Sequence, residues 1–203
     1  KNVVVVGGSN GIGLAISIGF LEEGSTVHIL SRTRRKIIER ELTTKFPSKV
    51  YFHLCDAMNF DSILKIKIHI IETFGDSLDI LISNVGDGSG SQDSIPPIHE
   101  WDHSWGQNFS TAVNAARAFH SEIFTSQGSM LFISSIAGLE FLGAPTAYST
   151  AKSALNSFVK TLSHRLAPGV RVNAIAPGNI WIPEGAWHKK SIINEKKLKE
   201  MLR

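Results

Sequence analysis

The sequence is poor in the residues that disulfide frameworks and structural metal sites use. Cys55 is its one cysteine among 203 residues, which excludes a disulfide framework and a cysteine-based zinc finger. Its eight histidines show none of the spacings that bind a metal ion along a helix. We therefore expect no metal site.

Long apolar runs and a dense charge of one sign are also missing. No apolar stretch reaches the roughly 18 residues that a membrane helix needs, and no secretory signal is recognisable. The net charge is only +3, with scattered lysines and arginines, whereas nucleic-acid-binding proteins carry a dense basic face. These absences predict a cytoplasmic protein that binds neither membranes nor nucleic acid.

Short β-branched segments alternate with segments of helical periodicity along most of the chain. The expected strands are 2–6, 26–30, 49–54, 78–82, 130–134 and 170–175, and the expected helices are 11–23, 33–45, 61–74, 100–125, 147–166 and 195–202. This alternation is typical of right-handed βαβ units around a parallel sheet. The sequence therefore predicts an α/β fold in one domain, 1–203, with its ligand beyond the carboxyl ends of the strands.

A glycine-rich turn follows the first expected strand. Residues 7–13 read Gly-Gly-Ser-Asn-Gly-Ile-Gly and run directly into the first expected helix. Small residues let the backbone approach a pyrophosphate, and the N–H groups of a helix N-terminus bind phosphate. A tight strand–helix turn without a ligand would use the same glycines, but the position at the first βα junction favours a dinucleotide.

Two polar positions follow the second and third expected strands. Arg32 stands where an acidic residue often holds the adenosine ribose, and a guanidinium there suits a 2′-phosphate. A solvated basic helix start is the alternative for Arg32, Arg34 and Arg35. Asp56 is a candidate acceptor for the adenine amino group, or else a cap for the helix that follows.

Tyr148 and Lys152 are four residues apart at the start of an expected helix, so their side chains lie on one helix face. Such pairs are common on helix surfaces, and a surface pair is the alternative interpretation. Tyrosine is scarce in this chain, however, with only two residues. A lysine ammonium about 4 Å from a phenol lowers the phenol pKa from about 10 toward neutrality, where acid–base catalysis is efficient. Desolvation of the phenolate opposes this lowering, so a shift of about three pK units is an upper limit.

Together these motifs resemble the classical short-chain dehydrogenase/reductase family. They occur in that family's order: Gly7-x-x-x-Gly11-x-Gly13, Asn84-x-Gly86, Ser135, Tyr148-x-x-x-Lys152 and Pro177-Gly178. Ser135 precedes Tyr148 by 13 residues and Asn108 precedes Ser135 by 27, as in the family. The resemblance implies a Rossmann-type, doubly wound parallel sheet with helices on both faces.

The resemblance also implies the roles of individual residues. Tyr148 would act as the acid or base, Ser135 would hydrogen-bond the substrate oxygen, and Lys152 would bind the nicotinamide ribose. Asn108 would hold a water that links Lys152 to solvent. The implied cofactor-binding residues, besides Tyr148 and Lys152, are Gly7, Ser9, Asn10, Gly11, Ile12, Gly13, Arg32, Asp56, Ala57, Asn84, Gly86, Pro177, Gly178 and Ile180.

Two features depart from the family's pattern. Ile182 replaces a threonine that often contacts the nicotinamide amide. Family members also have a seventh strand near the C-terminus, which we expect to be missing from this chain. Residues 177–203 would form the region that covers the substrate.

The implied function is hydride transfer between NADP(H), with NAD as the alternative, and an alcohol or carbonyl substrate. A narrower similarity to members associated with flagellin or surface-polysaccharide modification suggests a sugar or sugar nucleotide. A dinucleotide-binding sensor or partner subunit without catalysis is the competing hypothesis. Family members associate through two long helices, and 100–125 and 147–166 carry more small and apolar residues than one buried face needs. We therefore expect a homodimer or homotetramer that acts on a small molecule.

Overall fold

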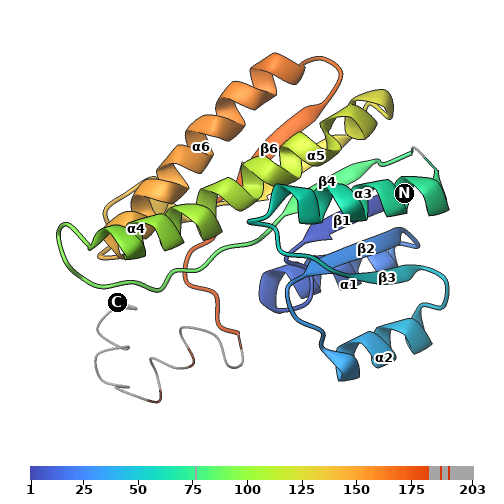
Figure 1. Ribbon diagram of the computed structural model, residues 1–203, viewed down its shortest axis with the longest axis horizontal. Helices are drawn as coiled ribbons and strands as arrows, with labels where there is room; N and C mark the ends of the chain where they lie inside the picture. The colour runs from blue at the N-terminus through green and yellow to red at the C-terminus, as the bar shows by residue number, and fades with distance from the viewer. Residues whose placement is uncertain (76, 183–187, 189–191, 193–203) are drawn as a thin grey trace.

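The computed structural model describes residues 1–75, 77–182, 188 and 192, and it places one parallel sheet at the centre of the chain (Figure 1). Its strands follow the order β3-β2-β1-β4-β5-β6, and every neighbouring pair is parallel. The bounds are β1 Asn2–Val6, β2 Thr26–Ser31, β3 Val50–Leu54, β4 Ile80–Ser83, β5 Ser129–Ile133 and β6 Arg171–Ile175. The chain winds outward from β1 to β3, then returns to place β4 on the other side of β1. This reversal confirms the doubly wound α/β fold.

Helices cover both faces of the sheet. Figure 1 shows α3, α5 and α6 on one side and α1 and α2 on the other. Their bounds, with those of the shorter segments, are α1 Gly11–Glu22, α2 Lys36–Lys45, α3 Phe60–Phe74, α4 Ile98–Trp105, the π-helical segment η1 Gly106–Ser110, α5 Thr111–Thr125, the 3₁₀ turn η2 Ile136–Gly138 and α6 Thr146–Leu166. No helix in the described part of the chain is long and apolar enough to cross a membrane.

The continuous valine run of β1 reflects burial on both faces. Val4 and Val6 pack into the core on the α3, α5 and α6 side, and Val3 and Val5 pack into the core on the α1 and α2 side. All four side chains are at most 1% exposed. A central parallel strand is covered on both faces, which explains an unbroken apolar run in place of alternation.

The expected helix 100–125 is interrupted in its register. α4 and α5 are joined without a break by η1, whose π-helical turns lie between them. π-helical turns insert one extra residue and often occur at functional sites. The helical periodicity of residues 100–125 did not reveal this π-helical segment, which contains Asn108.

The small residues of α5 do not support the argument for an oligomer. Ala112, Ala115, Ala116 and Ala118 are buried in the chain's own core, at 4% exposure or less. They let α5 lie close to the sheet and to α3. The burial of these four alanines therefore needs no partner subunit, and the expected homodimer or homotetramer stays a prediction. The expected helix 195–202 lies outside the described residues.

Candidate functional site

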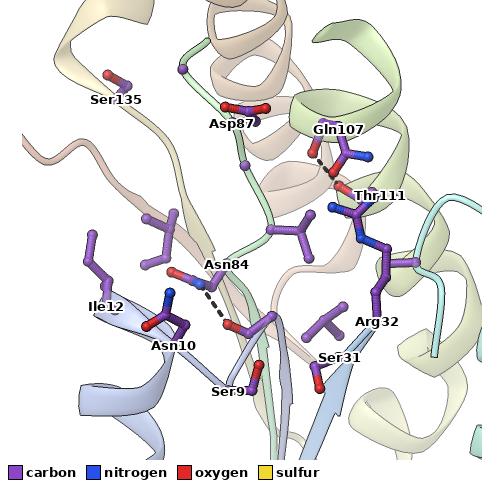
Figure 2. Close-up of a pocket in the computed structure, with 18 of the residues that line it drawn as sticks. Ser9, Asn10, Ile12, Ser31, Arg32, Asn84, Asp87, Gln107, Thr111 and Ser135 are labelled. Carbon is purple, nitrogen blue, oxygen red and sulfur yellow. Dashed lines mark hydrogen bonds between the residues drawn. The ribbon is translucent and has the colours of Figure 1, made fainter. Parts of the chain in front are cut away.

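A cavity of about 560 Å³ opens at the carboxyl ends of the strands. Figure 2 shows polar side chains that enter it from several different loops. The segments that follow all six strands contribute to its lining, as expected for ligand binding in a parallel sheet. The predicted residues that line it are Gly7, Ser9, Asn10, Gly11, Ile12, Arg32, Asp56, Ala57, Asn84, Gly86, Ser135, Tyr148, Lys152, Pro177, Gly178 and Ile180.

The glycine turn depends on its glycines for close packing. A Cβ on Gly13 would overlap the carbonyl oxygen of Gly7 and lie 2.6 Å from Nδ2 of Asn84. Gly13 does not line the cavity, so its role is to let α1 approach β1. Gly7 and Gly11 have φ values of 82° and 52°, which other residues adopt only with strain.

The start of α1 is suited to a phosphate. Asn10 occupies the N-cap position and makes no side-chain capping hydrogen bond. The first N–H groups of an α-helix have no partner within the helix, and Gly11 and Ile12 of this turn line the cavity. Ser9, Asn10 and Ile12 lie together along this edge in Figure 2.

Arg32 and Arg34 have different surroundings. Arg32 lines the cavity beside Ser31 and Thr33. Arg34 does not line it, and its Nε donates to Glu39 Oε2 at 2.9 Å. The structure therefore leaves Arg32 as the cavity's guanidinium and engages Arg34 in a surface ion pair.

Asp56 is not the cap of the following helix. Asn59 occupies the N-cap of α3 and accepts a hydrogen bond from the Ser62 backbone N–H at 3.2 Å. Asp56 Oδ1 instead accepts from the Met58 N–H at 3.0 Å. The capping alternative was therefore wrong, because the helix begins three residues later than it required. Asp56 and Ala57 both line the cavity.

Ser135, Tyr148 and Lys152 meet at the end of β5. Ser135 Oγ accepts from the Ala137 N–H at 3.1 Å and shares a hydrogen bond with Tyr148. Lys152 is 3% exposed, and its Nζ donates to the carbonyl oxygen of Ile133 at 2.9 Å. The strand end thus positions both the hydroxyl of Ser135 and the ammonium of Lys152.

The pKa of Tyr148 is raised rather than lowered. Burial raises it most, the hydrogen bond with Ser135 opposes this, and the negative charge of Asp87 raises it further. Burial lowers the pKa of Lys152 to about 8. The predicted lowering of the Tyr148 pKa toward neutrality was therefore wrong, because burial, which disfavours the charged phenolate, is the largest effect and the charge of Asp87 acts in the same direction. Tyr148 is protonated at neutral pH and is equipped to donate a proton.

Asn108 lies behind the cavity and does not line it. Its side chain is fully buried, with Oδ1 accepting from the Asp87 N–H and Nδ2 donating to the Asp87 carbonyl oxygen, both at 2.9 Å. A Cβ on Gly86 would lie 3.0 Å from Asn108 Oδ1 and 3.1 Å from Lys152 Nζ. Gly86 thus allows Asn108 and Lys152 to approach the same stretch of backbone.

Several lining residues were missed by the sequence prediction. Asp87 follows the predicted Gly86 directly and could have been found as a charged residue after a strand end. Gln107 is 2% exposed and comes from η1, where its proximity to the cavity carries no sequence signal. The other missed polar or small residues are Ser31, Thr33, Cys55, Gly88, Thr111 and Ser134.

The segment after β6 contributes to the cavity wall. Ile182 lines the cavity, and its Cδ1 would lie 2.9 Å from a Cβ on Gly11. Of the predicted lid 177–203, residues 177–182, 188 and 192 are described, and the rest lies outside the described residues. Among the residues described, no group of three or more histidine, cysteine or acidic side chains could hold a metal ion.

Residues 1–186 match the family model for short chain dehydrogenases. The chain belongs to the classical short-chain dehydrogenase/reductase family. A tropinone reductase homolog of Arabidopsis thaliana is 31% identical over 208 residues, which cover 98% of this chain and 77% of the relative. The family is one of oxidoreductases, and the motif order found in the sequence is the family's own.

Solved structures agree with this assignment. The L-sorbose reductase of Gluconobacter frateurii, solved with NADPH and L-sorbose, has a TM-score of 0.87 and 29% identity, covering 98% of this chain and 78% of the other. An NADPH-dependent 3-quinuclidinone reductase of Rhodotorula rubra has a TM-score of 0.83 and 28% identity, covering 98% and 74%. The described fold is therefore that of a short-chain dehydrogenase/reductase.

The residues present fit the nicotinamide dinucleotide that this family implies. Gly7 and Gly11 of the glycine turn line the cavity without side chains, and the uncapped start of α1 offers N–H donors to a phosphate. Arg32, directly after β2, and Lys152, on α6, supply positive charge at separate places in the cavity lining. A dinucleotide with several phosphates matches this distribution.

Proposed function

We propose that this protein is an NADP(H)-dependent reductase of carbonyl substrates, and that it also catalyses the reverse oxidation. The observation that carries the proposal is the convergence of Ser135, Tyr148 and Lys152 on the same cavity as the glycine turn and Arg32. A nucleotide site and a proton donor that share one cavity serve hydride and proton transfer to one substrate.

The proposed mechanism divides the work among three side chains. The bound nicotinamide supplies the hydride that the carbonyl carbon accepts. Ser135 orients the carbonyl oxygen, and Tyr148 donates the proton that this oxygen needs as negative charge develops on it. Lys152 donates a hydrogen bond to the Ile133 carbonyl oxygen, which holds its ammonium in place. In this mechanism the ammonium binds the nicotinamide ribose and supplies positive charge near Tyr148.

Arg32 supports NADP(H) over NAD(H). Its guanidinium lines the cavity next to Ser31, whose hydroxyl donates to the Thr33 carbonyl oxygen at 2.9 Å and so orders this short turn. A 2′-phosphate gains charge-assisted hydrogen bonds from such a group, whereas a bare ribose does not. Of the two solved relatives named above, the 3-quinuclidinone reductase is NADPH-dependent and the L-sorbose reductase was solved with NADPH bound.

For the substrate, we favour a polyhydroxylated carbonyl compound such as a sugar. The L-sorbose reductase acts on a ketose, and its fold matches along nearly the whole chain. The similarity to members of flagellin or surface-polysaccharide modification points in the same direction.

We further propose a cytoplasmic homodimer or homotetramer, for which light scattering at micromolar concentration is the test.

The decisive experiment follows NADPH oxidation with a panel of sugars, steroid ketones and acyl thioesters, for the unmodified protein and for Tyr148→Phe. We expect turnover with at least one ketose and its loss in the variant. NADPH binding without turnover of any panel member would favour the sensor hypothesis. Tighter binding of NADH than of NADPH would overturn the choice of cofactor.

A further inference from the structure

Asp87 places a carboxylate at the reacting end of the cavity. It lies on the loop that follows β4, between Gly86 and Gly88, and it lines the cavity. Figure 2 shows it at the end that also holds Ser135, away from Ser9 and Ser31 at the nucleotide end. Its side chain is 45% exposed, so the carboxylate is accessible to a ligand.

The loop that carries Asp87 passes close to Tyr148. A Cβ on the next residue, Gly88, would lie 3.7 Å from Cζ of Tyr148. The charge of Asp87 also acts on the Tyr148 phenol, whose pKa it raises. When the carbonyl oxygen of a substrate contacts Tyr148, the groups on the carbon next to that carbonyl therefore lie near Asp87.

The loop backbone at Asp87 is held firmly. Its N–H and its carbonyl oxygen are both hydrogen-bonded to the buried amide of Asn108 at 2.9 Å. These two hydrogen bonds fix the backbone of Asp87 and therefore the position of its Cα atom. Asp87 thus occupies a defined place next to the substrate, although it belongs to a glycine- and serine-rich loop.

The carboxylate itself is oriented and charged. Oδ1 accepts from the Ser89 N–H at 2.9 Å, and Oδ2 accepts from the Ser89 hydroxyl at 2.8 Å. Nε2 of His103, on α4, lies 3.7 Å from Oδ2. Burial raises the pKa of Asp87, but the hydrogen bonds from Ser89 and the interaction with the nearby His103 outweigh burial and hold the pKa below its usual value.

The carboxylate retains capacity to bind a ligand. Each carboxylate oxygen can accept two hydrogen bonds, and Ser89 uses one on each. The proton donor of the proposed reaction is Tyr148, so the chemistry does not use Asp87. A charged acceptor beside a reaction centre discriminates between substrates by the group that they present to it.

We propose that Asp87 is a specificity-determining residue, whose carboxylate accepts a hydrogen bond from a donor group, hydroxyl or ammonium, on the carbon next to the reacting carbonyl. The same carboxylate rejects substrates that carry a carboxylate at this position. This inference rests on the proposed reduction of carbonyl substrates and specifies which of them fit.

The test uses three ketones of similar size: hydroxyacetone, 2-butanone and pyruvate. They present a hydroxyl, a methyl and a carboxylate at the same place. We expect a higher kcat/KM for hydroxyacetone than for 2-butanone, and Asp87→Asn should lower this ratio by about tenfold or more, since it removes a charge-assisted hydrogen bond. Because both ketones use Tyr148, an effect of the variant on the phenol cancels in the ratio. Aminoacetone then distinguishes an ammonium preference from a hydroxyl preference.

Asp93→Asn is the matched control, because Asp93 is an exposed acid on the same loop that does not line the cavity. It removes the same charge and should leave the ratio unchanged. Pyruvate should gain activity in Asp87→Asn and not in Asp93→Asn. If Asp87→Asn still turns over both ketones and leaves the kcat/KM ratio of hydroxyacetone to 2-butanone unchanged, the proposed role of Asp87 is wrong, while the proposed reductase function stands.

A readout without turnover separates this inference from the proposed function. Ligand-observed NMR compares the binding of 1,2-propanediol and 2-butanol to the protein saturated with NADPH. We expect the diol to bind more tightly and Asp87→Asn to remove the preference. No NADPH oxidation with any ketone would contradict the reductase, while equal binding of the two alcohols would contradict the assignment of Asp87.

Discussion

Asn84, at the end of β4, donates from Nδ2 to the carbonyl oxygen of Gly7, at the end of β1, over 2.9 Å. These two strands are neighbours at the reversal of the sheet order, where ligands bind in doubly wound folds. The side chain from one strand end thus fixes the glycine turn at the other. Asn84 supports the nucleotide site by holding this turn as well as by lining the cavity.

Gly13→Ala should disrupt this arrangement. The added methyl would overlap the Gly7 carbonyl oxygen and press on Asn84, both of which are held in place. We expect NADPH affinity to fall by at least about tenfold, since displacement of the turn moves the phosphate donors. Gly19→Ala on the same helix is the control, because a Cβ there meets nothing within 4 Å. It should leave affinity unchanged and stabilise α1 by up to about 1 kcal/mol. Equal NADPH affinity in both variants would contradict the proposed packing role.

Arg32 and Arg34 should differ in their effect on cofactor choice. Arg32→Ala should weaken NADPH binding by about 10- to 100-fold and leave NADH binding nearly unchanged, as expected for loss of a contact to the 2′-phosphate. Arg32→Asp should reverse the preference. Arg34→Ala should preserve it, since Arg34 is paired with Glu39 outside the cavity. Calorimetry with both cofactors measures these ratios, and a larger effect from Arg34 would refute the assignment.

Tyr148→Phe should lower turnover by about two to four orders of magnitude, the usual contribution of a positioned acid–base group. NADPH binding should persist, because Lys152 and the glycine turn are unchanged. Since the pKa of Tyr148 is raised, the phenol stays protonated to about pH 10 and above. Reduction should therefore show no loss from Tyr148 ionisation below that pH. Full activity of the variant on a substrate that the unmodified protein reduces would exclude Tyr148 as the proton donor.

Lys152 should make NADPH affinity depend on pH. Burial lowers its pKa to about 8, so the ammonium is present below that pH and is lost as the pH rises through it. NADPH affinity should fall as the pH rises above about 8, as measured by fluorescence titration from pH 6 to pH 10. Lys152→Met should bind weakly throughout and lack this step. A step that persists in Lys152→Met would belong to another group.

His28 and His53 should make stability fall in acid. His28 is fully buried, with Nδ1 3.2 Å from Nε2 of His53, and His69 faces the same pair. Burial first, and then the neighbouring histidines, lower the pKa of both His28 and His53 from 6.5 to about 4. The unfolded chain therefore binds protons first as the pH falls below 6.5. Stability should decrease from about pH 6.5 down to pH 4, by roughly 3 kcal/mol for His28.

Urea unfolding between pH 4 and pH 8 measures this dependence. His28→Leu removes the buried titrating group and should flatten the acid limb, at some cost in stability at neutral pH. His164→Gln changes an exposed histidine on α6 and should leave the slope as it is. An equally steep acid limb in His28→Leu would show that other groups cause the loss.

The sheet and many of the residues that line the cavity could be predicted from the sequence because each rests on a local signal. The β-branched run at Val3–Val6 and the adjacent glycine turn specify a strand and a phosphate site without knowledge of the rest of the chain. The 13-residue spacing from Ser135 to Tyr148 likewise predicts that Ser135 follows a strand and that Tyr148 lies at the start of the next long helix.

Features that depend on neighbours in space could not be predicted in this way. The direction of the Tyr148 pKa shift depends on burial and on Asp87, which lies 61 positions earlier in the sequence. The burial of Ala112 and Ala115 depends on how closely α5 approaches the sheet. The place of Gln107 in the cavity depends on the π-helical register of η1.

The contribution of every strand end to one cavity links nucleotide binding to the folding of the whole domain. Lining residues run from Val6 to Ile182, so the cavity is complete only after all the crossovers have formed. Such long-range assembly is slow compared with local helix formation. A dinucleotide that binds only the assembled cavity stabilises the entire cooperative unit, by about 2.7 kcal/mol at a hundredfold excess over its Kd. A higher cellular concentration of the cofactor would thereby lengthen the lifetime of the folded chain as well as raise its catalytic rate.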